Sequence, residues 1–112
     1  MSNRLFQSVI HQMKDAIDRV IGVIDENGVV ISCSELVKIG EVRQNVREEM
    51  SYTSDVMTLG GYTYRTLGSP NKTEYIIFVE GEDKQAENMS MILSVSLSSI
   101  GHSISHIASS SP

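Results

Sequence analysis

The most constraining feature of this sequence is an Asn-Gly pair flanked by two short apolar runs. Val20-Ile-Gly-Val-Ile precedes the pair and Val29-Val-Ile-Ser-Cys33 follows it, and both runs are rich in β-branched residues. Asn and Gly tolerate the positive φ angles of a tight primed turn, so Asn27-Gly28 predicts a β-hairpin at this point. Any fold for the chain must therefore contain an antiparallel strand pair near its start.

Helical periodicity lies on both sides of the predicted strands. Residues 3–21 carry apolar side chains at spacings of three and four, which predicts an amphipathic helix. A second long helix is predicted from Asp83 to about Ile107, where Ala86, Leu93, Ile100 and Ile107 stand seven residues apart. This segment is rich in Ser, so the helix needs packing against another surface to be stable.

The middle of the chain predicts one more helix and three more strands. Ser34 can cap a short helical turn, and Gly40 separates this turn from a helix over 41–50 with Val42, Val46 and Met50 on one face. Strands are predicted over 55–59, 62–67 and 74–80. Turns at Gly60-Gly61 and over 68–72 separate these three strands.

This order of elements defines a fold class. A helix, two strands, a helix, three strands and a helix form an α+β domain with a central five-stranded antiparallel sheet, the general make-up of profilin-like folds such as PAS, GAF and roadblock modules. The length of 112 residues predicts one domain. We place this domain at residues 1–107, followed by a disordered tail at 108–112.

Charge and composition exclude several classes of protein. A net charge of −5 argues against a domain that grips a nucleic-acid backbone, and the single cysteine excludes an internal disulfide framework. The start of the chain lacks the apolar run of a secretory signal, and no stretch is long and apolar enough for a membrane span. We therefore expect a cytoplasmic protein that does not contact a membrane.

The sequence contains no recognisable catalytic motif. Cys33 ends an apolar strand, which predicts a small buried core residue rather than a nucleophile. His102 and His106 have a spacing that could place two imidazoles on one metal, but no third ligand is evident. We therefore expect a protein that is not an enzyme and has no cofactor, no metal site and no catalytic residues.

Cationic and hydroxyl side chains near the middle helix suggest a site for a small carboxylate. Ser34, Lys38 and Arg43 flank the start of that helix, and Arg65 could complete the wall of a pocket. These four residues are the predicted ligand-binding residues. Strand alternation places Arg65 on the face opposite to Tyr64, so one shared pocket requires a bulge. The alternative is that Lys38 and Arg43 are solvated surface charges balanced by nearby glutamates.

Two segments resemble a known family. Residues 17–41 contain Asp25, Gly28, Ser32 and Lys38-Ile-Gly40 in the order and spacing of the amino-terminal sensory domain of carbohydrate diacid regulators. These are bacterial transcription factors grouped with the purine-catabolism regulators. Residues 77–83 resemble the last strand of that domain and its turn into the final helix. The resemblance implies a sugar-diacid-recognition domain that binds its effector beneath the sheet.

The resemblance also implies a route for the signal. The last helix would pass the effector signal to a DNA-binding region that lies outside this chain. The apolar stripes of the first and last helices, which include Phe6, Ile10, Leu93 and Leu97, predict a homodimer through these helices. The alternative function is a roadblock-like scaffold that binds a small GTPase, which has the same order of elements and a similar compact length.

Overall fold

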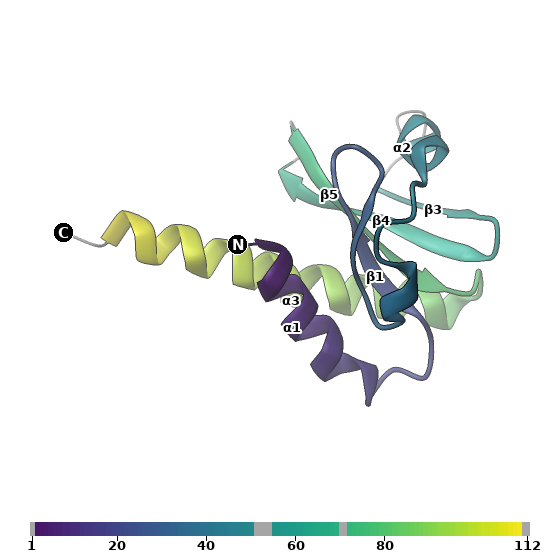
Figure 1. Cartoon of the computed structure of the whole chain (residues 1–112), viewed down its shortest axis with the longest axis horizontal. Coiled ribbons are helices and arrows are strands. Elements are labelled where there is room, and N and C mark those ends of the chain that lie inside the picture. The colour runs from purple at the N-terminus through teal and green to yellow at the C-terminus, as the bar shows by residue number, and fades with distance from the viewer. Residues whose placement is uncertain (1, 51–54, 70–71, 111–112) are drawn as a thin grey trace.

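The structure, a computed structural model, describes residues 2–50, 55–69 and 72–110. It has an α+β fold in which helices cover both faces of a five-stranded antiparallel sheet, as predicted (Figure 1). In chain order the elements are α1 (Ser2–Lys14), β1 (Ile21–Ile24), β2 (Val30–Cys33), the 3-10 helix η1 (Leu36–Lys38), α2 (Gln44–Met50), β3 (Val56–Leu59), β4 (Tyr62–Ser69), β5 (Lys72–Glu80) and α3 (Lys84–Ser110).

The last strand of the chain lies at the centre of the sheet. The strand order is β2-β1-β5-β4-β3, and every neighbouring pair is antiparallel. Residues 76–79 of β5 are buried, as expected for a strand covered on both faces. Among the described strands, the pairing of β1 with β5 therefore joins the N-terminal hairpin to the three C-terminal strands.

The two faces of the sheet carry separate apolar cores. Helices α1 and α3 cover one face, and α2 covers the other (Figure 1). The α1/α3 core contains Phe6, Ile10, Ile17, Ile21, Val23, Leu67, Ile77, Val79, Ala86, Leu93 and Leu97. The α2 core contains Val20, Ile24, Val30, Cys33, Val46, Met50, Tyr64, Ile76 and Phe78.

The apolar stripes that predicted a dimer through the first and last helices lie inside this fold. Phe6 and Ile10 of α1 and Leu93 and Leu97 of α3 are buried in the α1/α3 core. They cover the sheet of their own chain and are unavailable to a second chain. For these four side chains the prediction of a surface that faces a partner was wrong, whereas the side chains of Ile100 and Ile104, also part of the predicted stripe, lie outside the described ones.

The first helix is shorter than its periodicity predicted. It ends at Lys14 rather than at residue 21, and the backbone N–H of Ile17 closes the last turn on the Met13 carbonyl. Ile21 instead pairs with Val79 of β5. The β-branched residues that continued the helical pattern are thus used in the sheet, because pairing with β5 outweighs local helical preference.

The predicted N-terminal hairpin is confirmed, but its turn has a different geometry. Gly28 has a φ of 83°, whereas Asn27 does not have a positive φ, so the turn is not the two-residue primed type. The Asp25 carboxylate accepts hydrogen bonds from the N–H groups of Asn27 and Val29, at 2.9 and 3.0 Å. This is a three-residue loop in which the side chain of Asp25 supports the turn.

The two glycines between β3 and β4 form the tight primed turn. Gly60 and Gly61 have φ angles of 58° and 90°, and Leu59 pairs with Tyr62 across them. The strands on either side of the later turn are longer than predicted, since β4 reaches Ser69 and β5 begins at Lys72. Residues 70–71 of the turn predicted over 68–72 lie outside the described residues.

The segment between β2 and β3 differs in two details from its prediction. The 3-10 helix η1 begins after Glu35, and the Ser34 hydroxyl does not cap it but accepts a hydrogen bond from the Ile21 N–H at 3.0 Å. Val46 and Met50 of α2 are buried as predicted, but Val42 is 64% exposed. Val42 precedes α2 and bridges to Val29, so it is outside the helical face.

The final helix is longer than predicted. It continues to Ser110, three residues beyond the predicted end, and residues 111–112 lie outside the described part of the chain. In Figure 1 its second half extends away from the sheet.

A glutamine of α1 completes the hydrogen bonding of edge strand β2. The Gln7 side-chain amide donates to the Cys33 carbonyl at 3.1 Å, and its oxygen accepts from the Cys33 N–H at 3.0 Å. The amide thereby takes the place of a neighbouring strand. This pair of bonds fixes α1 against the sheet at the end of β2.

Phe78 of β5 packs against a glycine of β1. A methyl group at Gly22 would lie 2.7 Å from Phe78 Cε2 and 2.5 Å from the Ser32 carbonyl oxygen, so only glycine leaves room for this ring. Gly22 and Phe78 are paired in register. The ring in turn contacts Tyr62 edge-on, with the ring centroids 5.7 Å apart.

We predict that Gly22→Ala destabilises the fold by about 1–3 kcal/mol, because the Phe78 ring and the Ser32 carbonyl must both move. Chemical denaturation of Gly22→Ala, Phe78→Leu and the double variant measures this free energy of unfolding. The double variant should lose less than the sum of the single losses, since a smaller side chain at position 78 relieves the clash. Strict additivity would contradict this steric explanation.

Candidate functional site

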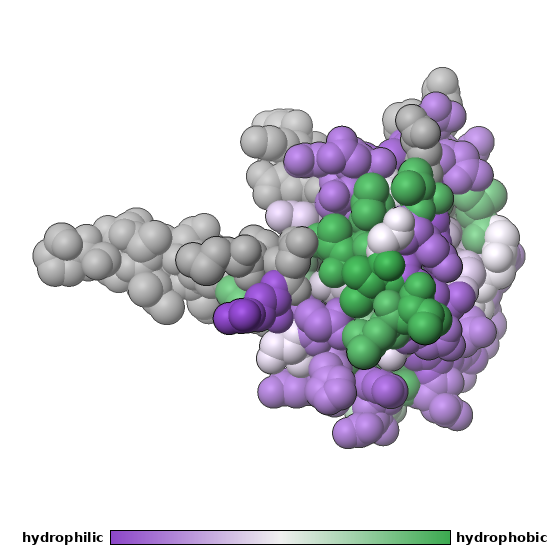
Figure 2. All heavy atoms as spheres, in the orientation of Figure 1, coloured by the Kyte–Doolittle hydropathy of each residue, from purple (hydrophilic) through white to green (hydrophobic). Residues whose placement is uncertain are grey.

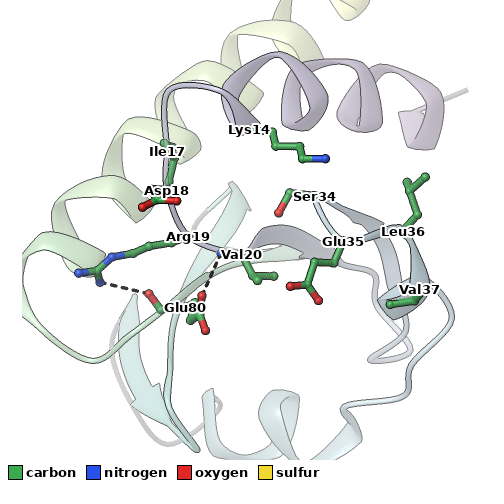
Figure 3. Close-up of a pocket in the computed structure, with 10 residues that line it drawn as sticks. All are labelled: Lys14, Ile17, Asp18, Arg19, Val20, Ser34, Glu35, Leu36, Val37 and Glu80. Atoms are coloured by element: carbon green, nitrogen blue, oxygen red, sulfur yellow. Dashed lines mark hydrogen bonds between the residues drawn. The ribbon is translucent and has the colours of Figure 1, made fainter.

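A cleft opens where the loop after α1 meets the end of β2. It has a volume of about 610 Å³ and lies between this loop, η1 and the end of β5 (Figure 3). Its walls combine charged, hydroxyl and apolar side chains. The lining residues are Lys14, Ile17, Asp18, Arg19, Val20, Ser34, Glu35, Leu36, Val37 and Glu80.

Backbone contacts hold the polar side chains of the cleft in place. The Ser34 hydroxyl accepts from the Ile21 N–H, so its own hydrogen remains available to a ligand. Glu80 accepts from the Val20 N–H through Oε1 at 3.2 Å, which leaves Oε2 as an acceptor. In Figure 3 the carboxyl groups of Glu35 and Glu80 lie below the Ser34 hydroxyl in the same opening.

Lys14 is the cation of this cleft without a countercharge. Among the described residues its ammonium group makes no hydrogen bond or ion pair, and its side chain is exposed. Figure 3 shows it reaching over the opening from the last turn of α1, on the side of Ser34. One ammonium group and one hydroxyl donor suit a single carboxylate.

Arg19 connects the cleft to the start of α3. Its guanidinium donates to both carboxylate oxygens of Asp83, at 2.6 and 2.8 Å, and to the Glu80 carbonyl at 3.2 Å. Asp83 immediately precedes α3 and accepts from the Ala86 N–H, so it caps this helix. The hydrogen bond from Arg19 is the main reason that the pKa of the Asp83 carboxyl is well below its ordinary value of 3.8.

Arg43 of the predicted site is used inside the fold. Its guanidinium lies 4.6 and 4.5 Å from the ring centroids of Tyr62 and Phe78 and donates to the Tyr64 hydroxyl at 3.2 Å. Glu41 accepts from Nε and from one terminal nitrogen, at 3.3 and 2.9 Å. Because its charge is balanced and its side chain is only 14% exposed, Arg43 has little left to offer an anion.

Lys38 lies beside this aromatic group. Tyr62 raises the pKa of Lys38 most strongly, and Glu35 and Glu41 add to the rise. The ammonium group lies 3.7 Å from a Glu35 carboxylate oxygen. The alternative derived from the sequence, that Lys38 and Arg43 are surface charges balanced by glutamates, describes the pairing of Lys38 well. It misses the stacking of Arg43 on aromatic rings.

Arg65 lies on the opposite face of the sheet from Arg43. Its Nε donates to the Ser90 hydroxyl of α3 at 2.9 Å, whereas the neighbouring Tyr64 packs in the α2 core. This is the alternation expected of a regular strand. The four predicted site residues therefore do not form one pocket: Ser34 lines the cleft, Lys38 and Arg43 lie beside Tyr62, and Arg65 lies under α3.

The sequence alone did not point to Lys14, Arg19 or Glu80. The periodicity places Lys14 and Arg19 on one continuous helix. Because the helix in fact ends at Lys14, the two side chains both line the cleft, which the pattern does not predict. Glu80 ends the strand predicted over 74–80 and belongs to the segment that resembles the regulator family, and neither feature indicates a site. The signal in the sequence for the Arg19 contact is Asp83, an acidic residue directly before the last helix.

Comparison with known proteins leaves the family open. No protein-family model matches this sequence, and no curated protein matches it significantly. Within the described residues, no helix has the length and apolar character needed to cross a membrane. The same part of the chain contains no group of three metal-ligating side chains, and the side chains of His102 and His106 lie outside it.

We predict that Asp83 stabilises the fold at neutral pH and loses this effect in acid. Its folded-state pKa is depressed, so the stabilisation is complete above the ordinary value of 3.8 and is lost as pH falls below that value. Thermal unfolding from pH 7 to pH 2 should show Asp83→Asn melting below the wild type at neutral pH and converging with it in acid. Glu26→Gln, at an exposed loop position, should track the wild type throughout. A gap that is as wide at pH 2 as at pH 7 would contradict the ion pair as its cause.

We predict that Cys33 reacts slowly with thiol reagents in the folded protein. The side chain is buried, as expected from the sequence, and burial raises the pKa of its thiol above the ordinary value of 9.0. Labelling should become fast only in denaturant. A Thr58→Cys variant supplies an exposed thiol as a control, and it should show one fast and one slow site. Fast labelling of the wild type would overturn a structural role.

Proposed function

We propose that this chain is a small-molecule-sensing domain that relays its signal through α3, in a bacterial transcription regulator of the carbohydrate diacid type. The main support is the position of Arg19, which lines the cleft and also holds the capping residue of α3. A ligand in the cleft would touch the residue on which the start of that helix depends. DNA would be contacted by a region outside this chain.

The cleft favours a small hydroxy-carboxylate as the effector. Lys14 and Ser34 can together hold one carboxylate through an ammonium group and a hydroxyl donor. Asp18, Glu35 and Glu80 are acceptors for the hydroxyl groups of such a ligand, but they repel further negative charge. A sugar acid with one carboxylate at Lys14 therefore suits these walls better than a ligand with clustered anionic groups.

The proposed relay works through competition for Arg19. The Arg19 side chain is partly exposed, at 23%, so an acceptor group of the ligand can draw its guanidinium away from Asp83. Asp83 then caps α3 less firmly, and the angle or stability of the first turn changes. Since α3 runs from this cap to Ser110, a change at its start can be carried along a rigid element to its far end.

A roadblock-like scaffold that binds a small GTPase is a second candidate, and one observation favours it. Leu36, Val37, Ile39 and Val42 are 67%, 89%, 40% and 64% exposed. Figure 2 shows an apolar patch over η1 and the adjoining loops, surrounded by polar surface. A contiguous patch of this kind is typical of a protein-binding surface. This candidate needs no ligand in the cleft.

Titration calorimetry of the chain with glycerate, glucarate and galactarate tests the sensing proposal. We expect heat of binding with at least one of these acids. Lys14→Gln should weaken that binding about ten-fold or more, since a charge-assisted hydrogen bond is lost. Lys84→Gln is the matched control, because Lys84 is an exposed lysine on α3 outside the cleft, and it should bind like the wild type.

The outcomes separate the two candidates. Binding of none of the acids, or equal weakening by both lysine variants, would contradict a carboxylate site in the cleft. A stable complex with a small GTPase that Val37→Lys abolishes, together with the absence of acid binding, would favour the scaffold.

A further inference from the structure

The outer side of α3 carries an exposed apolar row. Met91, Ile92 and Val95 are 54%, 55% and 62% exposed, and with Asn88 and Ser96 they line a hollow of about 410 Å³. No catalytic or ligand-binding role described above uses these side chains. Three large apolar side chains side by side are more than the isolated exposed apolar residues found on most surfaces.

This row lies on the side of α3 that does not face the sheet. Ser90, Leu93 and Leu97 are buried against the sheet and α1, whereas Met91 and Val95 are exposed. Over these turns the helix is therefore apolar on two sides. A helix with a single buried face ordinarily has polar residues on its outer side, so an apolar row there is typical of a surface that a partner covers.

The charge distribution indicates what covers it. All nine Lys and Arg residues and all fourteen Asp and Glu residues precede Asn88, so the last 25 residues contain none of these four types. Beyond Lys84 and Glu87 in its first turn, α3 therefore offers no countercharge to a nucleic acid or a strongly charged peptide. A neutral surface of apolar and small hydroxyl side chains is instead complementary to a copy of itself, as a two-fold symmetric interface requires.

The sequence of α3 adds a second reason for a partner. The helix is about 40 Å long at 1.5 Å per residue, and it extends past the sheet in Figure 1. Serine and glycine are weak helix formers, and a free helix segment of about 12 residues is marginal in water. The part that leaves the sheet contains Gly101 and six serines between positions 98 and 110, so it requires packing that the sheet does not supply.

We propose that two copies of this chain associate through the outer side of α3, with Met91, Ile92 and Val95 of each copy at the centre of the interface. This surface differs from the stripe predicted from periodicity, whose residues Phe6, Ile10, Leu93 and Leu97 are buried inside each chain. The inference is independent of the ligand in the cleft. Dimerisation places two α3 helices side by side, which rigidifies both.

Sedimentation equilibrium of the whole chain at about 1–100 µM tests this proposal. We expect the wild type to approach twice its chain mass of 12.4 kDa as concentration rises. Ile92→Lys and Val95→Lys should each raise the dimer dissociation constant about ten-fold or more, because each buries a charge at the centre of the interface. Both positions are exposed in one chain, so the circular dichroism spectrum of each monomer should be unchanged.

Val37→Lys is the matched control. Val37 is an apolar residue on η1 that is 89% exposed, so the same substitution is made away from α3 and should leave the dimer intact. A monomeric wild type at every concentration would overturn the proposal, as would a dimer that Val37→Lys breaks and Ile92→Lys does not. Co-sedimentation of a monomeric wild type with phosphatidylcholine vesicles would also overturn it, by assigning the row to a lipid surface.

Discussion

The packing of Phe78 onto Gly22 is the contact on which most of the α2 face depends. It joins the central strand to the N-terminal hairpin at a point where any side chain on β1 would push the ring away. The displaced ring would lose its contacts with Tyr62 and Tyr64. The Arg43 guanidinium would also lose the ring face on which it stacks. The absence of a side chain at Gly22 thus determines how Phe78 packs against the two tyrosines and where the Arg43 guanidinium lies.

The two faces of the sheet consequently have different roles. On the α2 face, Arg43 contributes to packing, because its guanidinium stacks on the Tyr62 ring and is paired with Glu41. A second set of charged groups lines the cleft at one end of the sheet, where the strands meet the loop after α1 and the start of α3. Arg19 and Asp83 belong to segments 64 residues apart, and they meet there because β5 returns the chain to the side of β1.

Local patterns predicted much of this fold, because hairpins and buried strands depend on neighbours in the sequence. The glycine pair before Tyr62 and the apolar run of β5 are of this kind. The end of α1 depends on the pairing of β1 with β5, and the role of Arg43 depends on Tyr62 and Phe78. These partners are far along the chain, so local periodicity does not reveal them. Ser34 was predicted in the site because it flanks the middle helix together with Lys38 and Arg43, but in the structure it lines the cleft, where it bonds to the Ile21 N–H.

The hydrogen bonds of Gln7 to Cys33 have a consequence for how copies of this protein can join. An unprotected edge strand invites the same strand of another molecule, and such growth can continue without limit. The amide of Gln7 occupies both backbone groups of Cys33 and closes that end of the edge to a foreign strand. The other end of the same edge is closed by residues 40–41, which bond to both backbone groups of Val30, so β2 is a poor template for open-ended fibres.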